Sequence, residues 1–206
     1  MHKSVLNQVQ IHSAHGSSDQ DLQDLQDILD MNDESMSRSQ LGEGGASSYA
    51  KYLDVLASAY KNLDQPDFGF VRKVFSARPY DPLIKRMRDY AVVEECTEAE
   101  DDVCFSYLLK GRNALWKLDL SVVGPFGIFV RLRNRVEAED FIVYSREDLT
   151  GFEVKMADLL KRAGVKLLSM DELSVAMPMT LYNTGRDKVR LYQALFSDRD
   201  RLPWET

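Results

Sequence analysis

Six carboxylates lie within nine residues near the middle of this chain. They are Glu94, Glu95, Glu98, Glu100, Asp101 and Asp102. Carboxylate oxygens bind Ca²⁺ or Mg²⁺, and a local excess of negative charge attracts a basic partner. The spacing matches no calcium-binding loop, because the glycine and the alternating ligands are absent. We therefore predict no metal site and no cofactor here. The alternatives are a solvated charged connection or a protein-binding surface, and Glu98, Glu100, Asp101 and Asp102 are the candidate partner contacts.

A second group of charged side chains follows one predicted strand. Arg131, Arg133 and Arg135 alternate in sequence, so their side chains point to the same face of a sheet. Lys117 is expected to join them from the neighbouring strand. Such a group could hold a phosphate or a carboxylate through bidentate hydrogen bonds, and Arg131 and Arg133 are candidate partner contacts. The alternative is an ordinary solvated sheet face whose arginines pair with nearby acids.

Histidine is confined to the beginning of the chain, at positions 2, 12 and 15, and residues 49–206 contain none. That part of the chain therefore cannot build a Ser-His-Asp or Cys-His site. The two cysteines, Cys96 and Cys104, have no nearby partners for zinc. We interpret both as small buried hydrophobic residues, Cys104 especially because it lies within a predicted strand. Phosphate-binding, dinucleotide-binding and metalloprotease motifs are also absent. We assign no catalytic residue; for an enzyme without histidine, Asp119, Lys117 and Arg131 would be the first suspects.

The elements that position these residues form an antiparallel β-meander of four strands over about residues 103–144. Apolar residues alternate with polar ones in 103–109, 116–122 and 128–132, which is typical of a sheet with one buried and one solvated face. A fourth strand is expected at 141–144. The turn Gly124-Pro-Phe-Gly127 suits a type I turn, and Phe126 at its tip is expected to be exposed as a further partner contact.

Helices are predicted on both sides of the meander, which gives an α+β fold with N-terminal and C-terminal helices. Apolar stripes at helical spacing predict helices from about Tyr49, Pro66 and Pro82, a long helix capped by residues 145–148, and a last helix capped by Thr184. Ser169-Met-Asp-Glu172 has the pattern of a capping box. Short strands are expected at 91–95, 165–168 and 177–182.

The distribution of charge divides the chain into two parts. Residues 1–48 carry eight acids against two bases, whereas residues 49–206 carry 25 acids and 24 bases. The polar, acidic first part is typical of a flexible extension. Within it, residues 19–31 predict one amphipathic helix, either a strap on its own domain or a docking helix for a partner. Residues 49–206 are predicted to form a single α+β domain.

These observations exclude several classes of protein and leave three. The chain has no strongly basic segment for nucleic acid and no membrane-spanning apolar run. We expect no secretory signal, and the two cysteines fit a reduced, cytoplasmic protein. We predict a non-enzymatic protein-binding protein, an inhibitor or immunity-type protein that neutralises a partner toxin. The alternatives are a small acidic secretion-type chaperone, which would be a dimer, and an enzyme that uses carboxylate, lysine or arginine groups.

Overall fold

The computed structural model describes residues 46–98, 102–133, 138–200 and 202–204. The predicted helix at 19–31 lies outside the described residues, as do Glu100, Asp101 and Arg135. Among the described residues, none of the helices combines the length and the apolar character that crossing a membrane requires.

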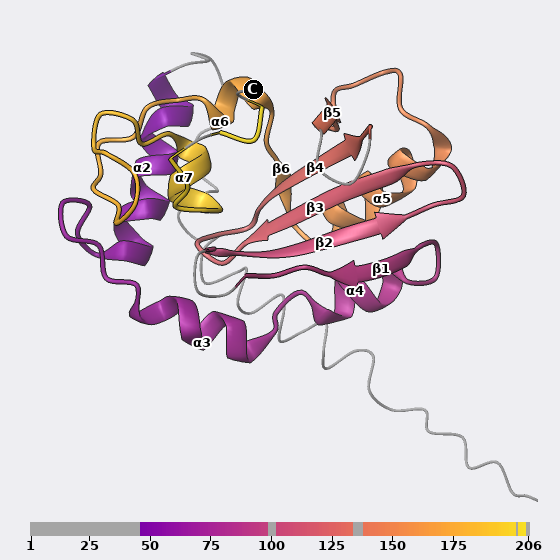
Figure 1. Cartoon of the computed structure of the whole chain (residues 1–206), viewed down its shortest axis with the longest axis horizontal. Coiled ribbons are helices and arrows are strands. Elements are labelled where there is room, and N and C mark those ends of the chain that lie inside the picture. The colour runs from indigo at the N-terminus through magenta and orange to yellow at the C-terminus, as the bar shows by residue number, and fades with distance from the viewer. Residues whose placement is uncertain (1–45, 99–101, 134–137, 201, 205–206) are drawn as a thin grey trace, which may run out of the picture.

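A mixed β-sheet forms the centre of the fold (Figure 1). In the described part of the chain, its first five strands follow one another in the order β1-β2-β3-β4-β5, and each pair is antiparallel. A sixth strand pairs with β4 in parallel, with Phe126 opposite Lys166. The strands are β1 (Val92–Glu95), β2 (Cys104–Lys110), β3 (Leu115–Ser121), β4 (Phe126–Leu132), β5 (Ala138–Phe141) and β6 (Lys166–Leu167). The α+β class and its antiparallel meander are confirmed, but the sheet is larger than the four strands predicted.

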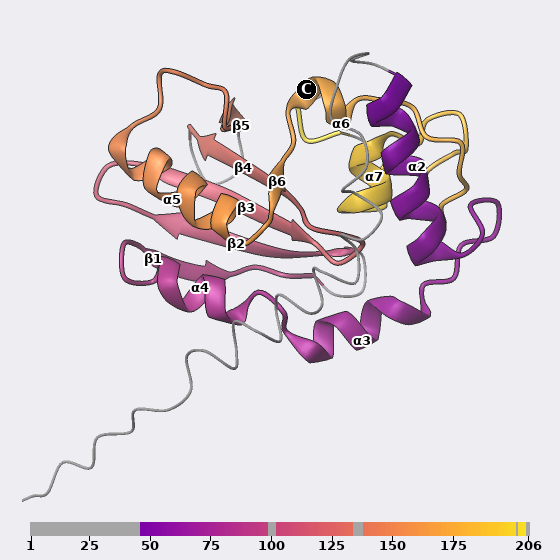
Figure 2. The same ribbon diagram turned by 180° about the vertical axis from the view of Figure 1, so that it is seen from behind.

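The helices form two groups around this sheet. In Figures 1 and 2, α4 and α5 lie against one face, whereas α2, α6 and α7 gather beside one end of the strands. The helices are α2 (Ala46–Tyr60), α3 (Gly69–Ala77), α4 (Asp81–Met87), α5 (Gly151–Arg162), α6 (Met170–Leu173) and α7 (Leu191–Leu195). We call the side covered by α4 and α5 the helical face and the opposite side the open face.

The prediction of one buried and one solvated sheet face is wrong. Most residues of β2, β3 and β4 are buried whichever face they point to. The register places Phe129 opposite Leu118 on the helical face, so Ile128, Val130 and Leu132 point to the open face. The C-terminal segment covers part of the open face: Ser121 donates a hydrogen bond to the carbonyl of Leu195. A strand covered on both sides is apolar at every position, which alternation alone does not reveal.

Several predicted boundaries also differ from the structure. The strand predicted at 141–144 corresponds to β5, which ends at Phe141 instead of beginning there. Residues 177–182, also predicted as a strand, form none. The last helix begins at Leu191, because the backbone N–H groups of Asn183 and Thr184 donate to the carboxylate of Asp198 at 2.7 and 3.0 Å. These bonds hold residues 183–184 in a loop in place of the helical turn that the sequence suggested.

Helix α5 is attached to the sheet through one buried carboxylate, that of Glu153. Thr150 caps the helix, and its backbone N–H and hydroxyl both donate to Glu153 at 2.8 Å, so the cap is not at 145–148 as predicted. The same carboxylate accepts hydrogen bonds from the indole of Trp116 at 2.8 Å and from both Nε and Nη2 of Arg131 at 2.8 and 2.7 Å. One side chain therefore joins a helix start to two strands.

These hydrogen bonds determine the pKa of the Glu153 carboxyl. Burial alone would raise the pKa of its carboxyl, but the hydrogen bonds from Arg131, Trp116 and Thr150 outweigh burial and lower the pKa to about 2. A group whose pKa is lower in the folded than in the unfolded chain stabilises the fold above its ordinary pKa. That contribution disappears as the pH falls toward the folded value.

The substitution Glu153→Gln tests this attachment. It keeps the size of the side chain but removes the buried charge that pairs with Arg131, which then keeps only Asp140 as an anionic partner. We therefore expect the free energy of unfolding at pH 7 to fall by about 3 kcal/mol. The Glu153 carboxyl should make the native protein lose stability between about pH 4.5 and pH 2, and the variant should lack this contribution. Urea unfolding across this pH range measures both effects. The exposed Glu147→Gln is the matched control, and equal unfolding midpoints in the two variants would contradict the prediction.

Candidate functional site

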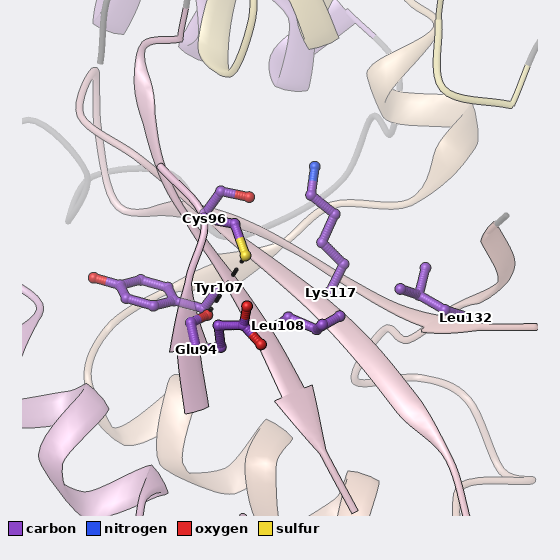
Figure 3. A pocket seen from close by; sticks show the side chains of 7 residues that line it. Glu94, Cys96, Tyr107, Leu108, Lys117 and Leu132 are labelled. Atoms are coloured by element: carbon purple, nitrogen blue, oxygen red, sulfur yellow. Dashed lines mark hydrogen bonds between the residues drawn. The ribbon is translucent and has the colours of Figure 1, made fainter. Parts of the chain in front are cut away.

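Two adjoining hollows lie on the open face of the sheet. The first, which we call the polar hollow, has a volume of about 180 Å³. It is lined by Cys96, Glu98, Asp102, Cys104, Ser106, Lys117, Asp119, Tyr192, Ser197 and Arg199. The second has a volume of about 260 Å³ and shares Cys96, Ser106 and Lys117 with the first. In Figure 3, Lys117 extends away from the sheet between Cys96 and Leu132.

Three polar side chains of neighbouring strands form the floor of the polar hollow. Asp119 is buried, with 4% of its surface exposed, and accepts a hydrogen bond from the Ser106 hydroxyl at 2.6 Å. Its other oxygen lies 2.9 Å from the ammonium of Lys117. Ser106 and Asp119 are directly opposite each other in the β2–β3 register, and Lys117 lies two residues before Asp119 on β3. The pleat of the sheet therefore directs all three to the open face.

The protonation of Lys117 follows from these neighbours. Burial favours the neutral amine, but the charge and the hydrogen bond of Asp119 outweigh burial and raise the pKa of Lys117 above its ordinary value. Lys117 is therefore an ammonium at neutral pH and has no lone pair with which to accept a proton. It can balance a negative charge, but it cannot act as a general base.

The wall of the polar hollow comes from two segments that are far apart in the sequence, the connection between β1 and β2 and the segment after α7. Asp102 forms a β-bridge with Ser197, and Glu98 forms an ion pair with Arg199. The Oδ1 atom of Asp102 and the hydroxyl of Ser197 are both buried, and neither completes a hydrogen bond of ordinary geometry with a described residue. The Ser197 hydroxyl nevertheless lies close enough to the Asp102 carboxyl to act on its pKa as a donor. Burial raises the pKa of the Asp102 carboxyl, and the nearby Ser197 hydroxyl and Arg199 guanidinium offset only part of that effect.

The two cysteines differ in accessibility. Cys104 is buried beneath the polar hollow, and burial together with the charges of Asp119 and Asp102 raises the pKa of its thiol well above the ordinary value. Cys96 is exposed at the rim, so the prediction that it is buried is wrong: it lies just beyond the edge strand β1, where nothing covers it fully. A buried neutral thiol is a poor nucleophile, so Cys104 acts as a packing residue, as predicted from the sequence.

The structure brings together only part of the sequence-predicted site. Glu98 and Asp102 line the polar hollow beside Lys117 and Asp119. Glu94 and Glu95, in contrast, form ion pairs with Lys110 and Arg78 on the body of the protein. The acidic segment therefore directs only some of its carboxylates toward the hollow.

The predicted group of arginines and Lys117 on one sheet face is not found. Arg131 lies opposite Trp116 on the helical face, where it binds Glu153 and Asp140. Lys117 is next to Trp116 in β3 and therefore points to the other face, so the predicted arginine–lysine group does not form. Arg133 is exposed just beyond β4.

Phe126 is not the exposed turn residue that was predicted. Its side chain is 7% exposed and meets Tyr52 of α2 edge-to-face, with 5.8 Å between the ring centres. Because α2 covers this end of the sheet, an aromatic ring near the turn gains more by packing than by solvation.

Sequence reasoning missed Ser106, Tyr192, Ser197 and Arg199. A polar residue within the apolar run of β2 was the available signal for Ser106, since buried hydroxyls need a hydrogen-bond partner. Ser197 and Arg199 lie in a polar tail that gives no sign of returning to the sheet. Only the pairing of residues near 102 with residues near 197 brings them to the hollow.

Comparisons with protein-family models, with curated proteins and with solved structures found no match to this chain. Within the part of the chain that the structure describes, no three His, Cys, Asp or Glu side chains are grouped so that they could hold a metal ion.

The substitution Asp119→Asn tests the electrostatics of the hollow. The amide can still bind the Ser106 hydroxyl, but it no longer balances the Lys117 charge, so we expect the pKa of Lys117 to fall from above to below its ordinary value. Titration of the Lys117 side-chain amine by NMR measures the change. The exposed pair of Lys61 and Asp67 provides the control: Asp67→Asn should leave Lys117 unchanged, and an equal effect of both substitutions would contradict the prediction.

The reactivity of the two thiols tests whether Cys104 is buried and Cys96 is exposed. We expect Cys96 to react with a thiol reagent in the native protein and Cys104 to react only after unfolding. Ellman titration before and after addition of denaturant counts the reactive thiols, and Cys96→Ser should abolish the native reaction. Rapid native labelling in that variant would show that Cys104 is accessible.

Proposed function

We propose that this chain is a non-enzymatic protein-binding protein, an inhibitor of the immunity type that neutralises a partner in the cytoplasm. The observation that carries the proposal is the mutual saturation of Ser106, Asp119 and Lys117. The serine donates to the carboxylate, the carboxylate is paired with the ammonium, and the ammonium is held protonated. Such a set presents fixed charges on a sheet, and its one proton acceptor, the carboxylate, is already engaged by the serine hydroxyl and the ammonium.

The charge around the hollow supports a basic partner. Glu98 and Asp102 belong to the acidic segment of residues 94–102, and both line the polar hollow. Residues 1–48 add a further excess of six negative charges. A negative surface of this kind speeds association with a basic protein by electrostatic steering and disfavours acidic competitors.

Charge reversal in the acidic segment tests the proposed interface. The partner to use is the purified product of the adjacent reading frame, co-expressed with this chain. We expect the triple substitution Glu98→Lys, Glu100→Lys and Asp101→Lys to lower the association rate roughly tenfold at low ionic strength, with a smaller effect at high salt. Stopped-flow association measurements over a range of salt concentrations provide the readout.

The matched control reverses two exposed acids outside the acidic segment, Asp54→Lys on α2 and Asp89→Lys in the turn after α4. A rate and salt dependence as in the native protein is expected for that control. If the triple variant behaved like the control, the acidic segment would not be the interface. A stable complex with an unfolded chain, instead of with one folded protein, would favour the chaperone alternative.

A further inference from the structure

We propose that the polar hollow binds one ammonium or guanidinium group, the end of a lysine or arginine side chain of the partner protein, with Asp102 as its counter-ion and Ser197 as an additional hydrogen-bond acceptor. The inference deepens the proposed function and rests on it for the source of that side chain. The cation-binding property of the hollow can be tested separately, with a small probe.

The first argument is the balance of charge within the hollow. Among the described residues that line it, Asp119 pairs with Lys117, and Glu98 pairs with Arg199. Asp102 contributes a third carboxylate, and no described cation lies within ion-pair distance of it. The hollow therefore carries about one negative charge in excess, which a singly charged cation would balance.

The second argument is the pair of buried polar atoms beside that charge. The Ser197 side chain belongs to a residue that is 3% exposed, and its hydroxyl completes no hydrogen bond of ordinary geometry with a described residue. The Oδ1 atom of Asp102 is also buried and also lacks a hydrogen bond of ordinary geometry to a described residue. The Ser197 hydroxyl lies close enough to the Asp102 carboxyl to lower its pKa as a donor. Its oxygen still has lone pairs, so a ligand that donates hydrogen bonds to both groups satisfies them together. Ammonium and guanidinium groups carry only donors.

The third argument is the shape and lining of the hollow. Its volume of about 180 Å³ is well above the ~10–15 Å³ that one water needs. Tyr192 provides an apolar wall, and its ring is fixed against Trp204 and Phe196 at centroid distances of 5.5 and 6.1 Å. Aromatic walls beside carboxylates suit the flat, weakly hydrated guanidinium group and the methylene groups that carry it.

The same lining disfavours other ligands. Lys117 and Arg199 both act on the Asp102 carboxyl through their charges, so a divalent metal would meet two positive groups beside a single unpaired carboxylate. An anion would have to displace Asp119 or Glu98 from existing ion pairs. A monovalent cation meets half the repulsion of a divalent one, displaces no existing ion pair, and can donate several hydrogen bonds.

The experiment uses the full chain and capped amino acids as probes. N-acetyl-arginine amide and N-acetyl-lysine amide are titrated into the ¹⁵N-labelled protein, and the amide shifts of residues near 102 and 197–199 are followed by NMR. We expect saturable shifts with at least one of the two charged probes. N-acetyl-citrulline amide, which has nearly the shape of arginine without its charge, should produce none.

Substitutions locate the site. Asp102→Asn should weaken the binding of the charged probe roughly tenfold or more, because it removes the charge. Ser197→Ala should weaken binding by a smaller factor and serves as the second variant should Asp102→Asn perturb the fold. Asp54→Asn on the outer side of α2 should leave probe binding unchanged.

Each outcome bears on the proposal. Equal binding of citrulline and arginine probes, unchanged affinity in both site variants, or no saturable shift with either charged probe up to about 50 mM would overturn it. Probe binding that depends on Asp102, together with partner association that ignores the acidic segment, would keep the cation site and refute the proposed interface. Probe binding that does not depend on Asp102, together with partner association that is slowed by charge reversal in the acidic segment, would keep the interface and refute this site.

Discussion

The buried carboxylate of Glu153 is the constraint from which the site geometry follows. Its hydrogen bonds hold the Trp116 indole and the Arg131 guanidinium on the helical face. Because side chains alternate along a strand, fixing Trp116 on that face turns Lys117 and Asp119 to the other. The polar floor of the hollow thus depends on a contact made on the opposite side of the sheet.

The two faces use charged groups differently. On the helical face, the carboxylate of Glu153 is completely buried, yet donors from three residues satisfy it, and its pKa falls to about 2. On the open face, Asp102 is only half-buried but lacks comparable partners, so its pKa rises. A buried charge that is fully hydrogen-bonded belongs to the framework of a protein, whereas one that lacks partners is suited to meeting a ligand.

Capping residues also connect elements that are distant in sequence. Glu172 completes the predicted capping box with Ser169, and its carboxylate accepts a hydrogen bond from Tyr52 of α2 at 2.7 Å. Lys166 of β6 lies 2.8 Å from both groups. Like Glu153, Glu172 therefore starts a helix and fixes the position of another element. This attachment holds α2 beside the sheet end that buries Phe126.

The sequence by itself determined the α+β class, the meander of β2 and β3, the capping box at Ser169 and the burial of Cys104, because these depend on local periodicity and side-chain size. It also indicated that a catalytic histidine is absent from residues 49–206. Tertiary structure decided which face each charge occupies: Arg131 and Lys117 both looked like solvated sheet residues, and the covering helix α5 separated them. It also brought Ser197 and Arg199 to Asp102. Contacts between residues about a hundred positions apart arise from packing energies that no local pattern encodes.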